Sequence, residues 1–539
     1  MHAEFLFVIL FSVATAVAIG ARWLKLPYTV ALVLAGLALG TVKAFEPPHL
    51  TKELLFAVIL PGLIFEAAFH LDAAKFWKEK TSIHALAIPG LIVAILATAA
   101  ILVPAANALA FVTGFTFMHG LVFAALIAAT DPIAVVGLFK SLGAPKRLAV
   151  MVEGESLLND GTGVVVFTII LGAMAGGGIS LGSAVVDFIR VAGLGALVGV
   201  AVGLAASHII RNIDDAMIEL TLTMVAAYGS FVLAERFHVS GVMAAVGAGM
   251  LCGNYAARTG MSPTTRVAVE TFWEYLAFAL NSVVFLLIGF EIHVDQLLAS
   301  WLPIVIAWVA VMAGRALVVF VVTALLQRTS ERVPWSWSTV VVWSGLRGAL
   351  SMVLVLGLPQ DFPHRVLLVN MTFGVVLLSI LLQGLTMAPL LRRLKIVGVR
   401  SDEQQRYELE RGRLKAAGAG LEEVERMRRE HAAPSAVLDG LEAEYRRQVE
   451  QADAVLKSLH LERAEIRHEE ERAARRRVLV AERDAALQAA QKGVVGSEAL
   501  DSLLADIDAR LTSLEDAPAP APTASAPAPA PPDARAAGG

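Results

Sequence analysis

The sequence predicts an all-α polytopic membrane protein followed by a charged tail, and three observations lead to this prediction. The chain has 539 residues, of which 57% are hydrophobic and 17% are charged, whereas soluble domains are about 45–50% apolar and about 25% charged. Apolar runs recur through residues 1–400, where only 45 side chains are charged. The other 139 residues hold 47 charged side chains, which indicates a soluble tail.

The same composition excludes several classes of protein. A chain this hydrophobic is not a soluble enzyme, and one cysteine, Cys252, cannot form a disulfide scaffold. No strongly basic segment predicts a nucleic-acid partner. The sequence contains no phosphate-binding glycine loop, nucleophile elbow or zinc-ligand spacing, so we expect no enzymatic activity and no cofactor.

We expect about thirteen transmembrane helices within residues 1–400. A hydrocarbon core of about 30 Å needs roughly 20 apolar residues per helix. The first run lacks a basic leader segment, so it is expected to be a span and not a cleaved signal peptide. The expected spans are 4–21, 27–43, 52–70, 83–103, 119–139, 149–174, 183–207, 217–234, 239–252, 271–290, 300–326, 336–357 and 366–391.

Loop charges predict the orientation of these spans in the cell (plasma or inner) membrane. If the helices alternate in direction, the loops on one side hold seventeen Lys and Arg residues and those on the other side hold five. Basic residues concentrate in cytoplasmic loops. The N-terminus is therefore expected outside and the tail in the cytoplasm, which requires an odd number of spans.

The chain is expected to have three parts. Residues 1–400 form the transmembrane domain. Residues 401–516 mix Glu and Arg with strong helix formers, so they predict solvated helices, with a hairpin break near Ala433-Pro434. The Pro-Ala repeats of residues 517–539 predict a disordered, extended end.

Helix five contains the first group that predicts function, Ala129-Thr130-Asp131-Pro132. An ionisable residue at mid-membrane costs on the order of 2.5–3.5 kcal/mol, so it is a functional-site hypothesis by default. Pro132 cannot donate a backbone hydrogen bond, so the helix should be interrupted there. Broken helices form ion sites in transporters. The alternative is that Asp131 only caps the second half-helix.

Helix six carries Glu155, Ser156, Asn159 and Asp160. Residues three and four apart share a helix face, so the last three lie together. Oxygen ligands suit hard cations, and Asp160, Ser156, Asp131 and Thr130 could supply them to Na⁺. A low-dielectric surrounding also favours the neutral form of a carboxyl group, so a proton can compete with the cation for Asp160. The alternative is a structural polar cluster.

Two arginines in later helices need partners because they cannot deprotonate. We expect Arg315 to pair with Glu155, the spare acid at comparable depth. Arg347 lies in Gly345-Leu346-Arg347-Gly348, and these glycines predict a second interrupted helix; the alternative is an arginine that snorkels from a helix end. The fifth and twelfth spans would then hold corresponding places in two inverted repeats. Glu66, in helix three, either lines the ion path or lies near the cytoplasmic end.

These motifs, in this order, resemble the signatures of the monovalent cation:proton antiporter family, in its NhaP-like sodium/proton exchanger branch. The resemblance covers essentially all of residues 1–400 and implies thirteen helices with inverted repeats, a core domain and a dimerisation domain, and elevator-like alternating access in a homodimer. It implies that Asp160 binds the ion or the proton beside a neutral Asn159. By the same resemblance the remaining site residues are Thr130, Asp131, Ser156 and Glu66, with Glu155, Arg315 and Arg347 as the ion pair and the helix-crossing arginine.

The function expected from this resemblance is electroneutral exchange of one Na⁺ (or Li⁺ or K⁺) for one H⁺, serving pH and sodium homeostasis. One carboxylate that holds either a cation or a proton agrees with this stoichiometry. The cation preference stays open, so a K⁺/H⁺ antiporter is an alternative. A cation channel would need a filter-like motif, which the sequence lacks, and a transporter-like sensor would signal through the tail.

Overall fold

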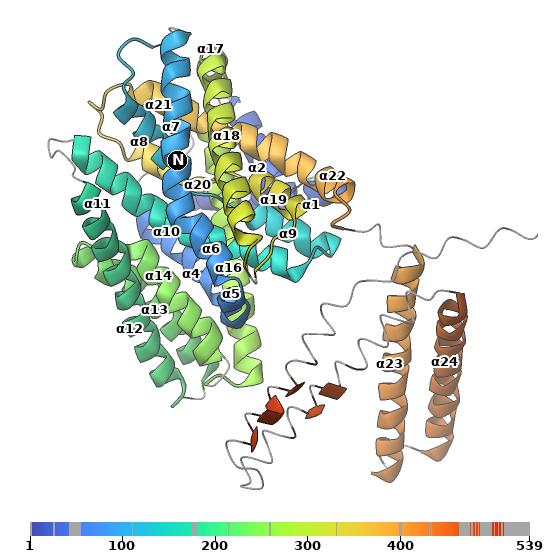
Figure 1. Cartoon of the computed structure of the whole chain (residues 1–539). Helices are drawn as coiled ribbons and strands as arrows, with labels where there is room; N and C mark the ends of the chain where they lie inside the picture. The colour runs from blue at the N-terminus through green and yellow to red at the C-terminus, as the bar shows by residue number, and fades with distance from the viewer. Residues whose placement is uncertain are drawn as a thin grey trace, which may run out of the picture. The chain divides into compact units, whose positions relative to one another are not determined.

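The structure is a computed structural model in which the chain forms two compact units, Met1–Gly398 and Val399–Gly539, described separately below (Figure 1). Every regular element in the described part of the chain is a helix. The structure describes residues 3–24, 27–41, 55–109, 112–174, 181–213, 215–257, 260–329, 331–397, 402–430, 432 and 434–462, with scattered residues between 475 and 510.

Each expected span corresponds to a helix or a pair of half-helices in the first unit. Within the described residues, seven stretches are long and apolar enough to cross a membrane. They are formed by α6 to α7 (Lys80–Ala108), α10 (Lys146–Met174), α11 to α12 (Leu181–Ile210), α13 (Ala216–Arg236), α16 (Pro263–Glu291), α18 (Trp301–Leu326) and α21 to α22 (Arg365–Arg393). Four further apolar helices are α1 (Ala3–Leu24), α2 (Tyr28–Thr41), α4 (Leu60–His70) and α14 (Gly241–Leu251).

The two remaining spans are interrupted, and they are the fifth and the twelfth. The fifth consists of α8 (Phe117–Leu126) and α9 (Ile133–Leu142). The twelfth consists of α19 (Trp335–Trp343) and α20 (Ala349–Leu356). The predicted interruptions are therefore both present, and Pro132 is the N-cap residue of α9.

Helix packing divides the first unit into two groups. In one group α2 packs on α1 and α16, while α14 packs on α4, α12 and α13. In the other, α7 packs on α8 and α18, α10 packs on α8, and α18 packs on α19 and α21. Both interrupted spans belong to the second group. We call the first the scaffold group and the second the site group.

The scaffold group contains a close helix crossing built on two glycines. A side chain at Gly36 of α2 would collide with the backbone at Leu286 and Gly289 of α16. A side chain at Gly289 would likewise collide with the backbone of α2. The two backbones can approach this closely only because both residues lack a Cβ atom. The crossing therefore depends on Gly36 and Gly289.

We expect Gly36→Ala to destabilise the protein by about 1–3 kcal/mol, because the added methyl group meets backbone atoms that cannot rotate away. Thermal unfolding in detergent measures this. Gly20→Ala in α1 is the matched control, since nothing lies within 4 Å of a side chain there, and alanine favours a helix by up to about 1 kcal/mol over glycine. Equal unfolding temperatures for the two variants would contradict the close crossing.

Loop contacts join three helix ends of the site group. Arg147, at the start of α10, forms an ion pair with Glu79 at 2.6 Å and donates a hydrogen bond to the carbonyl of Arg332 at 3.1 Å. Glu331 accepts hydrogen bonds from the backbone N–H groups of Thr81 and Ser82 at 3.4 and 3.0 Å. It therefore caps α6 from a distant loop. Burial alone would raise the pKa of Glu331, but these hydrogen bonds outweigh it and hold the pKa below its usual range.

We expect Glu331→Ala to cost about 1 kcal/mol of stability at neutral pH, the usual cost of losing a helix cap. Because the pKa is held low, the contribution is present above the unfolded pKa of about 4.3 and is lost as pH falls through the folded value. Thermal unfolding at a series of pH values measures the difference. Glu235→Ala, at an exposed position, is the control; a gap from wild type that stays constant down to pH 3 contradicts the cap.

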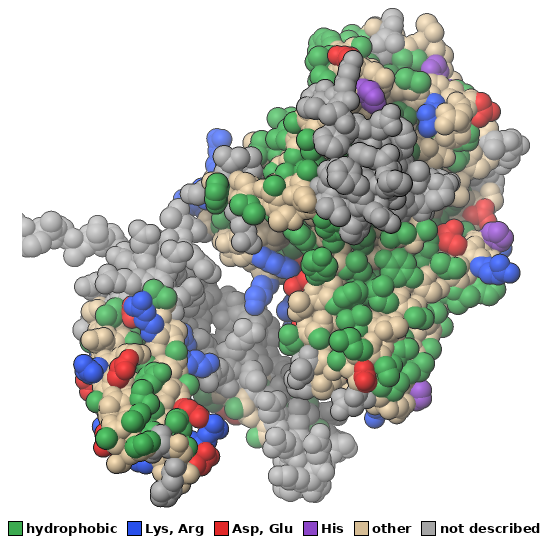
Figure 2. Space-filling view, turned by 180° about the vertical axis from the view of Figure 1, so that it is seen from behind, with side chains coloured by type: hydrophobic (Ala, Val, Ile, Leu, Met, Phe, Trp, Pro, Cys, Tyr) green, Lys and Arg blue, Asp and Glu red, His purple; other side chains and the backbone are tan. Residues whose placement is uncertain are grey.

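The surface of the first unit fits a lipid environment. Hydrophobic side chains form an extended area over the described part of the first unit seen in Figure 2, and charged side chains lie mainly around its margins. Exposed apolar residues include Val186, Ile189, Leu197, Val232 and Leu325. Such an extensive apolar surface is unusual for a soluble monomer.

The second unit contains a two-helix hairpin, α23 (Asp402–Arg429) and α24 (Ser435–Glu462). Arg428 forms ion pairs of 2.7 Å with Asp439 and Glu442 near the turn. Tyr407 and Leu456 pack together at the other end. The break lies where Ala433-Pro434 predicts it, and the expected extended end at 517–539 lies outside the described residues.

Candidate ion-binding site

The breaks in the two interrupted helices meet each other. The first break covers residues 127–132 and the second covers residues 344–348. The backbone N–H of Asp131 donates a hydrogen bond of 2.7 Å to the carbonyl of Leu346. Because each helix stops here, four half-helix ends and their unpaired backbone groups converge at one place.

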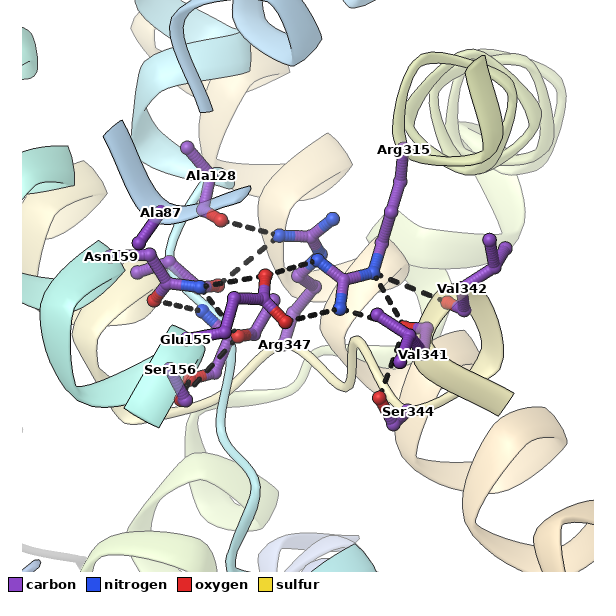
Figure 3. Close-up of polar contacts among 12 residues, drawn as sticks. Ala87, Ala128, Glu155, Ser156, Asn159, Arg315, Val341, Val342, Ser344 and Arg347 are labelled. Atoms are coloured by element: carbon purple, nitrogen blue, oxygen red, sulfur yellow. Dashed lines mark hydrogen bonds and ion pairs between the residues drawn. The ribbon is translucent and has the colours of Figure 1, made fainter. Parts of the chain in front are cut away.

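Arg347 binds the carbonyl end of α8. Its guanidinium donates hydrogen bonds to the carbonyls of Ala128 at 2.7 Å and Ala129 at 3.3 Å (Figure 3). Its backbone N–H donates to Ser379 Oγ at 3.1 Å. Arg347 is only 5% exposed, so it does not snorkel. Its positive charge instead lies at the negative end of the α8 dipole.

Arg315 binds the carbonyl end of α19, as Arg347 does for α8, and it also pairs with Glu155. It donates to the carbonyls of Val341 at 2.8 Å and Val342 at 3.3 Å. Its two terminal nitrogens contact the carboxylate oxygens of Glu155 at 2.8 and 3.0 Å, the pairing expected from the sequence (Figure 3). This bidentate ion pair is buried, so neither charge is left uncompensated.

Asp131 lies at the opposite, positive ends of the half-helices. Its Oδ1 accepts a hydrogen bond of 3.1 Å from the N–H of Ile133 and so caps α9. Its other oxygen lies beside Gly348, the N-cap residue of α20, where a side chain would contact it. The capping alternative for Asp131 is therefore present in the structure, and it leaves the second carboxylate oxygen facing the crossing.

Two side chains of α10 hold Thr130. Asn159 Nδ2 donates to Thr130 Oγ1 at 2.8 Å, and Asn159 Oδ1 accepts from the Thr130 N–H at 3.3 Å. The Ser156 hydroxyl donates to the Thr130 carbonyl and accepts from the Thr130 hydroxyl at 3.4 Å. All three residues are buried. After these bonds each hydroxyl oxygen still has one lone pair to offer.

Asp160 differs from its neighbours. Among the described residues it forms no hydrogen bond, and it is half-buried while Asn159 beside it is fully buried. The carboxyl groups of Asp131 and Glu155 are close enough to repel its charge. An unpaired carboxylate near two other acids attracts a cation or a proton, either of which relieves the repulsion.

Glu66 lies apart from this cluster. Its carboxylate is 3.1 Å from His70 Nδ1 on the next turn of α4, and His70 Nε2 is 3.8 Å from Glu274 of α16. No hydrogen bond or ion pair within the described residues joins Glu66 to Asp131 or Asp160. Asp131 and Glu155 are the acids that act on Asp160, and Glu66 is not among them, so the structure brings together every predicted site residue except Glu66.

Sequence reasoning missed the backbone partners of the site. The Ala128 carbonyl accepts from Arg347, the Val341 and Val342 carbonyls accept from Arg315, and Ser379 Oγ accepts from the Arg347 backbone N–H. Backbone acceptors have no side-chain signature. The only available signal was the pair of helix breaks, which predicts free carbonyls nearby.

Two helices that are interrupted at the same depth and cross beside buried charges define a secondary membrane transporter. The chain matches the family model described as "Sodium/hydrogen exchanger, transmembrane" over residues 8–393. It belongs to this sodium/hydrogen exchanger family, which confirms the family expected from the motifs.

Relatives and solved structures agree with this assignment. The chain is 35% identical over 399 residues to the Na⁺/H⁺ antiporter ApNhaP of Aphanothece halophytica, covering 74% of this chain and 75% of the relative. It is 33% identical over 511 residues to the Na⁺/H⁺ antiporter NhaG of Bacillus atrophaeus, covering 90% and 93%. The fold is similar to that of the sodium proton antiporter MjNhaP1 of Methanocaldococcus jannaschii, with a TM-score of 0.61 at 20% identity over 73% of this chain and 99% of that one. The predicted fold class is thereby confirmed.

Proposed function

We propose that the protein exchanges one Na⁺ for one H⁺ across the cell membrane, with Asp160 holding either the cation or the proton. The observation that carries this proposal is a half-buried carboxylate with no hydrogen-bond partner among the described residues, at the crossing of two interrupted helices. The antiporters named among the relatives support the choice of Na⁺ and H⁺.

The charge of the site supports electroneutral exchange. Two buried guanidinium groups, Arg315 and Arg347, face three carboxylates, Glu155, Asp131 and Asp160. With all five ionised the site carries one net negative charge, which a single Na⁺ or a single proton neutralises. Asn159 adds no charge. Each loaded form is therefore neutral, and a cycle that alternates between them moves no net charge.

Na⁺ would be held by oxygens that the described bonds leave available. Asp160 offers its carboxylate, and Asp131 offers the oxygen that does not cap α9. The hydroxyls of Thr130 and Ser156 each have a lone pair left. Glu66 lies outside this set, and we assign it to the cytoplasmic mouth of the ion path, beside His70.

Alternating access follows from the two helix groups. Every proposed ligand lies in the site group, so movement of that group against the scaffold group would carry the ion with its ligands. We propose that the site group is the mobile core and that the scaffold group forms the interface of a homodimer. The bias in loop charge supports an orientation with the N-terminus outside and residues 401–516 in the cytoplasm, and exchange in this orientation would serve pH and sodium homeostasis.

Reconstitution into proteoliposomes tests the proposal. A pH-sensitive dye quenched by an imposed proton gradient should recover on addition of Na⁺, and an imposed membrane potential should leave the rate unchanged. No recovery with Na⁺, Li⁺ or K⁺ would defeat the antiporter proposal. Recovery with K⁺ but not Na⁺ would identify a K⁺/H⁺ antiporter instead, and a dependence on membrane potential would exclude the 1:1 stoichiometry.

A further inference from the structure

The start of α8 carries two histidines that the transport site does not use. α8 is ten residues long and therefore about 15 Å from end to end. His119 lies in its first turn, whereas its last turn leads to the Ala128 and Ala129 carbonyls that bind Arg347. His364 lies opposite His119, at the N-cap of α21.

His119 holds the start of α8 through its unprotonated ring nitrogen. Its Nδ1 is 3.0 Å from the backbone nitrogen of Thr116, the N-cap residue, and 2.8 Å from the Thr116 hydroxyl oxygen. A backbone N–H can only donate, so Nδ1 is the acceptor and carries no proton. His119 occupies the place that Glu or Gln takes in a capping box. The cap therefore exists only with a neutral imidazole.

The surroundings of His119 contain a second histidine, His364. The ring of His364 lies 4.9 Å from the ring of His119, nearly perpendicular to it, and Phe115 and Phe362 pack against the same ring. His119 is 8% exposed. A second positive charge at this distance would repel a protonated His119.

The helices packed against α8 add no compensating charge. They are α7, α10, α20 and α21. Neither α7 nor α20 contains a titratable residue, and α10 has none after Asp160, which lies at the other end of α8. Asp361 is exposed, and the Arg365 guanidinium donates to the carbonyls of Leu356 and Leu358. No acid in this part of the described structure pairs with His119.

We propose that His119 is a proton-sensitive positioning residue, whose protonation breaks the cap of α8 and separates it from the α20–α21 loop. This frees the outer ends of both interrupted helices, because the α20–α21 loop follows the second of them. The Thr130-Asp131 segment follows α8 in the chain. We therefore expect that an unanchored α8 no longer holds this segment in place, and that exchange slows. The inference rests on the proposed function, and in the proposed orientation this end of α8 faces outside.

The variant His119→Gln distinguishes the two properties of His119, its role as a cap acceptor and its ability to take up a proton. Glutamine keeps an acceptor for the Thr116 N–H but takes up no proton in this range. We expect equal Na⁺-dependent exchange by the two proteins in proteoliposomes at pH 8. We expect exchange by the variant to be at least about twofold faster than by wild type at the acid end of the pH profile, where the imidazole of His119 takes up a proton. His364→Gln should also raise the exchange rate on the acid side of the pH profile, which we call the acid limb. His208→Gln, an exposed histidine at the end of α12, should not.

The outcomes distinguish the two proposals. Absence of exchange by wild type at pH 8 would defeat the proposed function. Exchange at pH 8 with superimposable acid limbs for wild type, His119→Gln and His364→Gln would overturn the role of His119 alone. If His119→Gln fails to fold, the acid limb of His364→Gln tests the proposal instead, because His364 does not cap α8.

Discussion

We expect Asp160→Asn to reduce Na⁺-dependent proton movement to the level of protein-free liposomes. Asparagine is nearly the same size but binds no proton and carries no charge, so it cannot alternate between the two loaded forms. The variant should nevertheless fold. Removing one of three neighbouring carboxylates, with Asp131 and Glu155 as the others, relieves like-charge repulsion, so the unfolding temperature should stay equal to that of wild type or rise.

The same dye assay in proteoliposomes measures this loss, with thermal unfolding in detergent as the check on folding. Asp361→Asn is the matched control, because Asp361 is an exposed aspartate outside the site, and it should exchange at the wild-type rate. Full exchange by a folded Asp160→Asn protein would remove Asp160 from the site. A lowered unfolding temperature would assign the carboxylate a structural role that its lack of hydrogen bonds among the described residues does not suggest.

The spans could be predicted from sequence because the bilayer imposes a length and a polarity on each of them. The interruptions of the fifth and twelfth spans could also be predicted, since Pro132 lacks a backbone N–H donor and Gly345 and Gly348 destabilise a helix. The buried pair Glu155–Arg315 followed from a charge rule alone, because a buried guanidinium needs an anion. Such features depend on local chemistry, which sequence displays directly.

What could not be predicted depends on tertiary geometry. Thr130 and Ser156 were expected as cation ligands, but nothing local indicates that they also bond to each other and to Asn159. Glu66 is acidic like the site residues, and only the placement of α4 shows that its partner is His70 on the next turn and not a residue of the site. The cap of α8 was likewise hidden, because histidine is an uncommon acceptor at that position of a capping box.

The largest stability effect is expected when the Glu155–Arg315 pair is broken from the arginine side. Arg315→Ala leaves Glu155 as a buried anion and removes the donors to the Val341 and Val342 carbonyls at the end of α19. Loss of one partner of a buried pair typically costs about 3–5 kcal/mol. The exposed pair Arg266–Glu270, with nitrogen and oxygen 2.7 Å apart, gives the matched control, and Arg266→Ala should cost about 0–1 kcal/mol.

A double-mutant cycle on thermal or denaturant unfolding separates the two tasks of Arg315. Glu155→Gln removes the buried anion but leaves Arg315 bound to the carbonyls, so adding Glu155→Gln to Arg315→Ala should recover part of the loss and give a coupling energy of about 0.5–3 kcal/mol. The remaining loss belongs to the unsatisfied end of α19, which no change at Glu155 can restore. Strictly additive losses would mean that Arg315 stabilises the protein through α19 alone and that its ion pair with Glu155 contributes no stability.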